Sequence, residues 1–117
     1  MRNRVFAGGL VGIVLATILF VGLQRSAMGA AQTAPAPVEV KIDNFSFGPG
    51  TVTLPVGTTV TWTNRDDIPH TVVSTEGVFK SKVLDTDEKF SFTFTKAGSF
   101  PYFCSIHPKM TGRVVVQ

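Results

Sequence analysis

The chain has 117 residues and a mass of 12.6 kDa, which is room for one small domain and excludes a second catalytic domain or a full dinucleotide-binding fold. Its formal net charge of +3 comes from the N-terminal end, because three arginines are the only charged residues among the first 30. The eight basic residues from position 31 onward are balanced by eight acidic ones, so the composition does not indicate a nucleic-acid-binding surface.

An uncharged apolar run occupies residues 5–23, after two arginines and before the small residues at 26–31. This order is typical of an export signal, and we expect cleavage after Gly29 to Ala31. The run is 19 residues long, enough to span a bilayer, so its retention as a membrane anchor is the alternative. We predict an export signal or anchor over residues 1–30 and, by the positive-inside rule, an exported, periplasmic domain that contacts a membrane only if the anchor is retained.

The rest of the chain divides into a linker and a folded domain. Residues 31–37 read AQTAPAP and are expected to be a flexible, extended linker. From residue 31 onward the chain has 12 Val, 13 Thr and 8 Phe, but only 2 Leu and 4 Ala. Because β-branched and aromatic residues favour strands over helices, this composition predicts a β domain over residues 38–117.

Apolar residues recur at every second position in several segments of this domain, which is the period of a strand with one buried face. In chain order they are Val38, Val40 and Ile42; Val60 and Trp62; Phe90, Phe92 and Phe94; and Val114 and Val116. Turn-forming sequences separate them at residues 47–50, 55–57, 64–67, 76–77 and 96–98. We predict an all-β fold, a small antiparallel Greek-key sandwich or barrel of seven or eight strands with a core of Val and Phe.

Cysteine, histidine and methionine are concentrated in one short segment. Beyond the leader the chain has one Cys, two His and one Met, and three of these four lie in the heptapeptide from Cys104 through His107 to Met110. The fourth, His70, lies 34 residues before Cys104, at the start of an apolar strand. A thiolate, two imidazoles and a thioether form a soft ligand set that suits copper, whereas methionine is a poor ligand for zinc, calcium or magnesium. These four residues therefore predict a copper site of the blue-copper, electron-transfer kind.

The motif Cys104-x-x-His107-x-x-Met110, after the aromatic strand at 100–103, resembles the cupredoxin family of type 1 blue-copper proteins. It is most similar to the amicyanins and less similar to plastocyanins and pseudoazurins, and the segment 60–64 that leads to His70 supports the same resemblance.

The resemblance implies that His70, Cys104, His107 and Met110 bind one type 1 copper that cycles between Cu(II) and Cu(I). The protein is then a one-electron carrier, not an enzyme. A dehydrogenase donor and a cytochrome acceptor are the implied partners, docking transiently near His107, which is implied to be the electron port. We expect the carrier to be a monomer.

One position departs from the family pattern. Members usually carry asparagine directly after the first histidine ligand, where its side chain braces the cysteine loop, and this chain has Thr71 there. Because a hydroxyl reaches less far and makes fewer hydrogen bonds than an amide, the rigidity of the loop does not follow from the motif as the ligand set does.

Other interpretations of the same residues stay open. The chain could be a copper-binding or delivery module without an electron-transfer role, although such sites usually use several Met or paired Cys ligands. A Cys104 and His107 nucleophile pair is the enzymatic alternative, but no orienting residue accompanies it in the sequence. His70 could be a hydrogen-bonded strand histidine, and Met110 could fill the core. Asp66 and Asp67 are expected to be solvated carboxylates in a polar turn.

Overall fold

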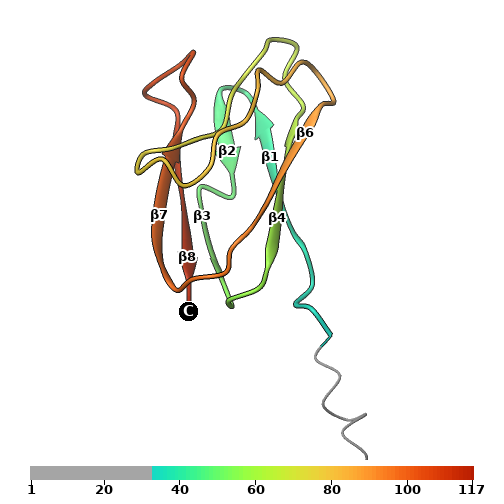
Figure 1. The fold of residues 1–117 in the computed structure, drawn as a ribbon. Helices are drawn as coiled ribbons and strands as arrows, with labels where there is room; N and C mark the ends of the chain where they lie inside the picture. The colour runs from blue at the N-terminus through green and yellow to red at the C-terminus, as the bar shows by residue number, and fades with distance from the viewer. Residues whose placement is uncertain (1–32) are drawn as a thin grey trace, which may run out of the picture. The chain divides into compact units, whose positions relative to one another are not determined.

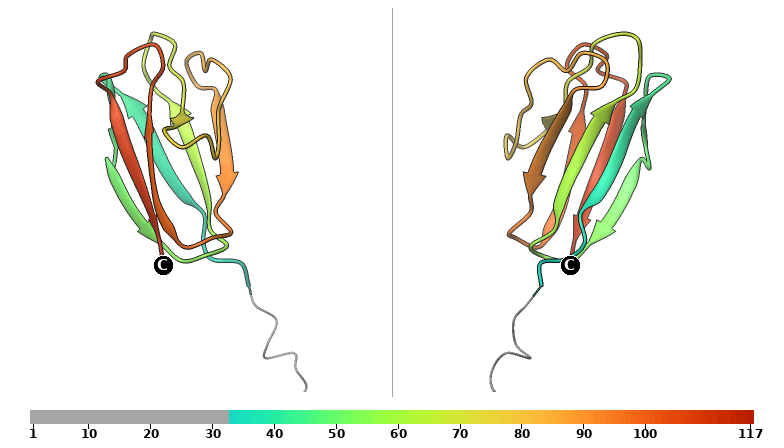
Figure 2. Two further views of the ribbon diagram at one scale, coloured as in Figure 1. Left: turned by 60° about the vertical axis from the view of Figure 1, so that its left-hand side comes forward. Right: turned by 90° about the vertical axis from the view of Figure 1, so that its right-hand side faces the viewer.

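The computed structural model describes residues 33–117, which form two facing β-sheets (Figures 1 and 2). The first sheet contains, in order across it, β2 (Ser46–Gly48), β1 (Val38–Asp43), β4 (Thr59–Asn64) and β6 (Lys89–Thr93). The second contains β3 (Thr51–Leu54), β8 (Thr111–Val116), β7 (Gly98–Phe103) and β5 (Val73–Ser74). The predicted all-β sandwich of seven or eight strands is confirmed.

Most of the predictions for the N-terminal end concern residues that the structure does not describe. The export signal or anchor at 1–30 and the first two linker residues lie outside the described part of the chain. Within the described part, no helix has the length and apolar character needed to cross a membrane.

The directions of the strands differ in part from the antiparallel prediction. Four of the pairs are antiparallel, namely β1 with β2, β4 with β6, β5 with β7, and β7 with β8. However, β1 is parallel to β4, and β3 is parallel to β8. The alternation of apolar residues determines which face of a strand is buried but not the direction of its neighbour, so the sequence pattern could not distinguish these arrangements.

The core lies between the sheets and contains most of the apolar residues predicted from the period-two pattern, whereas Val38, Phe90 and Phe92 are partly buried and pack against it. In β1, for example, Val40 and Ile42 are buried and the residues between and beside them are exposed. Trp62 is the largest fully buried side chain of the described residues. The centroid of its ring lies 5.5 Å from the ring centroid of Phe79 and 5.7 Å from that of Phe90. The buried apolar residues are Val40, Ile42, Phe47, Val52, Leu54, Val60, Trp62, Val72, Phe79, Leu84, Phe94, Tyr102, Cys104, Met110, Val114 and Val116.

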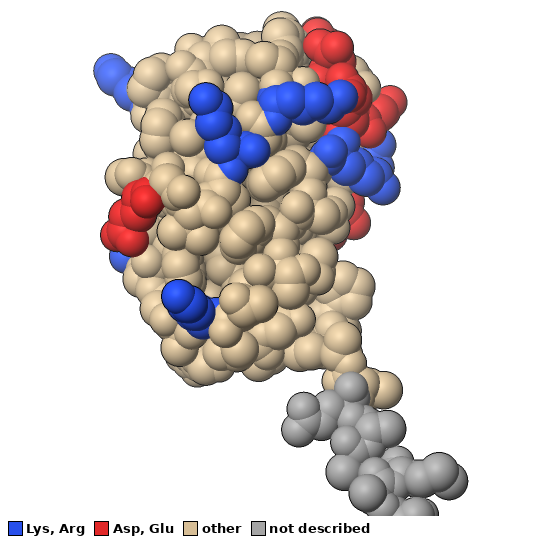
Figure 3. Space-filling view, in the orientation of Figure 1, with Lys and Arg blue, Asp and Glu red and all other residues tan. Residues whose placement is uncertain are grey.

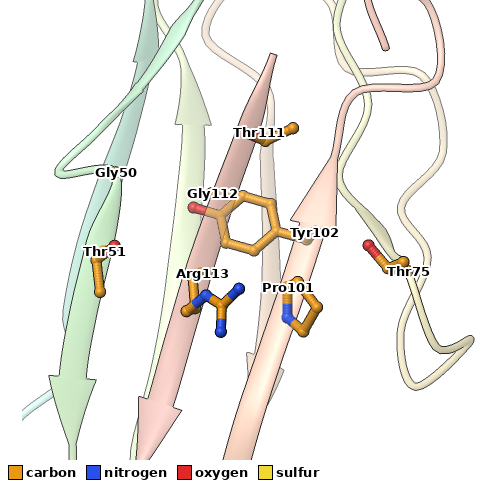
Figure 4. Close-up of a pocket in the computed structure, with 8 residues that line it drawn as sticks. All are labelled: Gly50, Thr51, Thr75, Pro101, Tyr102, Thr111, Gly112 and Arg113. Carbon is orange, nitrogen blue, oxygen red and sulfur yellow. The ribbon is translucent and has the colours of Figure 1, made fainter. Parts of the chain in front are cut away.

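A tyrosine packed over a glycine joins β7 to β8 next to the cysteine motif. Tyr102 is the register partner of Gly112, and its ring lies across that residue (Figure 4). A Cβ atom on Gly112 would overlap the ring. The same ring packs edge-on against Phe47 and Trp62, with centroid distances of 4.7 and 5.4 Å. Burial raises the pKa of Tyr102 to about 12. Gly112 is therefore the residue that lets this large side chain close the core two positions before Cys104.

The parallel pairing of β1 with β4 determines what lies beside the copper-type motif. Because the two strands run the same way, the turn after β1, at residues 43–46, lies at the same end of the sheet as the segment that follows β4. This is the end away from the C-terminus, where the 104–110 loop also lies (Figure 1). Segments far apart in the sequence therefore meet at one end of the sandwich.

Gly112→Ala tests the packing of Tyr102. The added methyl group collides with a buried ring, so the free energy of unfolding should fall by about 1–3 kcal/mol in urea denaturation. Gly50→Ala is the matched control, because a Cβ atom there would meet only the Phe47 carbonyl oxygen, at 3.8 Å. The control should leave stability unchanged or raise it by about 0.5 kcal/mol. Equal destabilisation of both variants would contradict this account of Gly112.

Candidate metal centre

Three of the four predicted ligands converge on one point. The donor atoms of His70, Cys104 and His107 all lie within 4.8 Å of one another. The Cys104 sulfur is 3.7 Å from Nδ1 of His70 and 3.8 Å from Nδ1 of His107. His70 and Cys104 are fully buried, whereas His107 is partly exposed. Two imidazole nitrogens and a sulfur in this arrangement could hold a single copper ion.

The loop that carries two of these residues is closed by its own backbone. Cys104 follows β7 directly, and its N–H donates to the Met110 carbonyl at 3.0 Å. The Met110 N–H in turn donates to the His107 carbonyl at 2.9 Å. Met110, the fourth predicted ligand, is buried at the end of this loop, just before β8. The loop is thus tied at both ends to neighbouring strands of one sheet, which restricts the positions of its side chains.

His70 is held by a different part of the fold. The backbone N–H of His70 donates to the Leu84 carbonyl at 3.1 Å, and the backbone N–H of Leu84 donates to the His70 carbonyl at 2.8 Å. The buried side-chain amide of Asn64, at the end of β4, donates to the carbonyls of Leu84 and Ile68, each at 2.9 Å. The backbone around the histidine is therefore held from two sides.

Asp66 is buried, and the prediction that it is a solvated turn residue was wrong; Asp67 is exposed as expected. One Asp66 oxygen lies 2.7 Å from Nε2 of His70. The same carboxylate accepts the backbone N–H groups of Asn44 at 2.8 Å and Phe45 at 3.0 Å. Burial by itself would raise the pKa of Asp66, but the bonds from Phe45, His70 and Asn44 outweigh it, and the pKa is lowered. In the sequence, the only indication of the contact between Asp66 and His70 was their four-residue spacing.

Phe45 is a second residue that the sequence did not reveal. Its ring packs edge-on against both histidines, with centroids 5.1 Å from His107 and 5.8 Å from His70. The residue is 54% exposed, and its φ of 54° lies in the left-handed region, as does the φ of 49° at Asn44. That conformation is uncommon for an aromatic residue and is held here by the hydrogen bonds to Asp66.

Thr71, the residue that departs from the family pattern, braces the cysteine loop. Its hydroxyl oxygen accepts the backbone N–H of Ser105 at 2.7 Å and lies 2.7 Å from the Ser105 hydroxyl. Its own N–H and hydroxyl point at the Cys104 sulfur, at 3.4 and 3.7 Å. The short side chain suffices because Ser105 brings a donor to it. Thr71 therefore ties the cysteine loop to the segment that carries His70.

The surroundings of Cys104 favour its thiolate form. Burial by itself would raise the pKa of the thiol, but hydrogen bonds from the Thr71 backbone, the His70 ring, and the backbone and ring of His107 outweigh it. Together they lower the pKa from 9.0 to about 6. A sulfur that is anionic near neutral pH is the form that binds a metal ion.

The lowered pKa of Cys104 makes the stability of the metal-free protein depend on pH. Between about pH 6 and 9 the unfolded chain binds a proton that the folded chain does not, so stability should rise with pH, by at most about 1.4 kcal/mol per pH unit. The contribution is complete above pH 9 and is lost as the pH falls through about 6. Urea unfolding of the metal-free protein across this range, with Cys104→Ser as the control, measures it. A wild-type profile that is parallel to that of the control would refute the shift.

Thr71→Val tests the brace, because it keeps the shape of the side chain and removes the hydroxyl. It leaves the Ser105 N–H without its acceptor, so we expect a loss of about 1–3 kcal/mol in the unfolding free energy of the metal-free protein. Thr61→Val is the matched control, since its hydroxyl bonds to Ser91 on an exposed face, at 2.7 Å. The control should change stability by less than about 0.5 kcal/mol. If the two variants lose the same stability, the hydroxyl of Thr71 is not a brace.

Known proteins resemble the chain in sequence and in structure. The profile of a family described as a cupredoxin-like domain matches residues 12–116. The chain is 36% identical over 98 residues to amicyanin of Paracoccus denitrificans, covering 80% of this chain and 75% of that protein. It is 37% identical to amicyanin-alpha of Methylorubrum extorquens in an alignment of 123 residues that covers both proteins completely. A solved purple cupredoxin from Nitrosopumilus maritimus superposes with a TM-score of 0.65 at 35% identity, covering 68% of this chain and 99% of that one.

These similarities agree with the predictions from the motif. The resemblance to blue-copper proteins, and to amicyanins in particular, is confirmed. Copper as the cofactor is supported by two independent observations, namely the relatives and the three donor atoms that the structure brings together.

Proposed function

The chain belongs to the cupredoxin family, and we propose that it is a type 1 blue-copper carrier of single electrons that acts outside the cytoplasm. In this proposal His70, Cys104, His107 and Met110 would hold one copper ion, which supplies the Cu(II)/Cu(I) couple. The observation that carries the proposal is the convergence of two Nδ1 atoms and one sulfur within 4.8 Å of one another. The apolar run at 5–23 after two arginines supports export.

The burial of the donor atoms favours electron transfer over catalysis. Cys104 and His70 are 0% exposed, so no substrate molecule can approach the sulfur without rearrangement of the loop. The imidazole of His107, which is partly exposed, is the one donor group of the three with a path to solvent. An electron can pass through that ring, whereas a reacting group cannot reach the metal.

The rigidity of the site supports the same function. The Cys104 loop is closed by its own backbone hydrogen bonds, and the backbone of His70 is paired with Leu84. These bonds are made by the backbone of the protein itself, and they restrict the positions of the ligands. A preorganised site changes little in geometry when the charge of the metal changes, and a small reorganisation favours fast electron transfer.

The surface around His107 supports transient docking of redox partners. Phe45 and Ile106 are 54% and 44% exposed, and Pro69 and Pro108 are exposed beside the two histidines. Most of the face in Figure 3 is uncharged; acidic and basic side chains gather at its upper right, and the other charged side chains are scattered over the centre and the left. A small apolar surface of this kind fits weak, short-lived complexes, with a dehydrogenase as the proposed donor and a cytochrome as the proposed acceptor.

Visible absorption of the copper-loaded protein tests the proposed centre. A thiolate bound to Cu(II) should give an intense visible band that bleaches on reduction and returns on oxidation. Cys104→Ser should lose the band, whereas Ser99→Ala, far along β7 from the site, should retain it. A wild-type protein that binds copper without such a band would instead favour a copper-delivery role.

Electron exchange with a cytochrome tests the docking surface. Ile106→Lys places a charge beside His107 and should slow the bimolecular rate about tenfold, equivalent to about 1.4 kcal/mol. Val56→Lys is the matched control, because Val56 is equally exposed, at 44%, and lies in the turn that contacts the C-terminal residue. Stopped-flow mixing at fixed ionic strength measures both variants. Equal rates for the two would place the docking surface elsewhere.

A further inference from the structure

The turn between β1 and β2 carries a further inference, which rests on the proposed function. Asp43 and Ser46 are register partners, so Asn44 and Phe45 form a two-residue hairpin turn. Both central residues have a positive φ, of 49° and 54°, as in a type I′ turn. The second position of such a turn commonly holds glycine, because a Cβ atom in the left-handed region lies too close to the following carbonyl oxygen. Phe45 therefore occupies a position where its side chain strains the backbone.

Neither burial nor backbone hydrogen bonding accounts for an aromatic residue in this turn. Phe45 is 54% exposed, more than any other large hydrophobic residue in the described part of the chain, so its ring is not a core side chain. The turn is held from outside, because the N–H groups of Asn44 and Phe45 donate to the two carboxylate oxygens of Asp66. A glycine at position 45 would make the same backbone bond without the strain.

The contacts of the ring point to the function of the side chain. Its centroid lies 5.1 Å from that of His107 and 5.8 Å from that of His70, both in edge-on packing. The His70 side chain is fully buried, so a partner protein cannot touch it directly. A partner that packs on Phe45 is separated from each imidazole by a single side chain. The exposed neighbours Ile106 and Pro108 are uncharged, so the partner surface that fits this position is apolar.

We propose that Phe45 is a contact residue for electron partners: its ring receives an apolar surface of a redox protein and couples that surface to both imidazoles. This function explains an aromatic side chain at a turn position that suits glycine. With a cytochrome as the partner, the reduced cytochrome loses one electron and the oxidised copper protein gains one, and no bond forms or breaks. A strained residue retained for function lowers the stability of the fold, so the turn should be more stable without the ring.

Electron exchange with a cytochrome, measured by stopped-flow mixing of the copper-loaded protein, tests the contact. Phe45→Ala and Phe45→Gly both remove the ring, and each should slow the bimolecular rate about tenfold. Phe45→Tyr keeps an aromatic ring and should stay within about twofold of the wild-type rate. All three variants should retain the visible copper band, because Phe45 supplies no ligand atom.

Urea unfolding of the metal-free variants tests the strain separately. Phe45→Gly should have an unfolding equilibrium constant about tenfold lower than that of Phe45→Ala, because glycine alone is unstrained at this φ. Val56 is the matched control, since it is 44% exposed, has no positive φ and lies in the turn that contacts the C-terminal residue. There the order should reverse, with Val56→Ala about two- to fivefold more stable than Val56→Gly, and neither should change the rate of electron exchange.

Wild-type rates for both Phe45→Ala and Phe45→Gly would overturn the proposal, and so would a Phe45→Ala protein at least as stable as Phe45→Gly. If Phe45→Ala does not fold while Phe45→Gly does, the strain is confirmed and Phe45→Gly carries the kinetic test. A wild-type protein without the visible copper band would overturn the proposed function and this proposal together. A wild-type band with unchanged rates in the variants would overturn this proposal alone.

Discussion

A sulfur that is buried and yet ionised is the interaction on which the rest of the structure depends. Cys104 is 0% exposed, which opposes the charge, and its pKa is nonetheless lowered to about 6. The balance is reached only because donors from Thr71, His70 and His107 surround the sulfur. The same groups that stabilise the anion also include the two imidazoles of the candidate metal centre. The arrangement of side chains that stabilises the anionic sulfur is therefore the same one that brings the candidate ligands together.

The fold brings these groups together at one end of the sandwich. The cysteine loop connects β7 to β8, which are antiparallel neighbours, so its two ends are close by construction. His70 comes from the segment beyond β4 in the other sheet, and the parallel pairing of β1 with β4 adds the turn of Asn44 and Phe45. The site is thus assembled from segments that follow strands of both sheets: the cysteine loop is closed by its own backbone hydrogen bonds, and the backbone of His70 is paired with Leu84 outside the strands.

The parts of the site that are local in sequence could be predicted, and the parts that depend on strand pairing could not. The heptapeptide from Cys104 to Met110 contains three candidate metal ligands at short spacing, so a metal site could be predicted there without a structure. The role of Asp66 depends on amide groups 21 and 22 residues away, which reach it only because β1 and β4 are parallel. The alternation of apolar residues shows buried faces but not strand directions, and for this reason Asp66 resembled a solvated turn residue. The bracing by Thr71 could not be predicted for a similar reason, since its partner Ser105 lies 34 residues away.

X-ray absorption at the copper edge of the loaded wild-type protein tests the central claim most directly, because it identifies the atoms bound to the metal. The account predicts one sulfur scatterer at short distance together with two imidazole nitrogens, in both oxidation states. A copper ion surrounded only by nitrogen and oxygen, with no short sulfur contact, would contradict it.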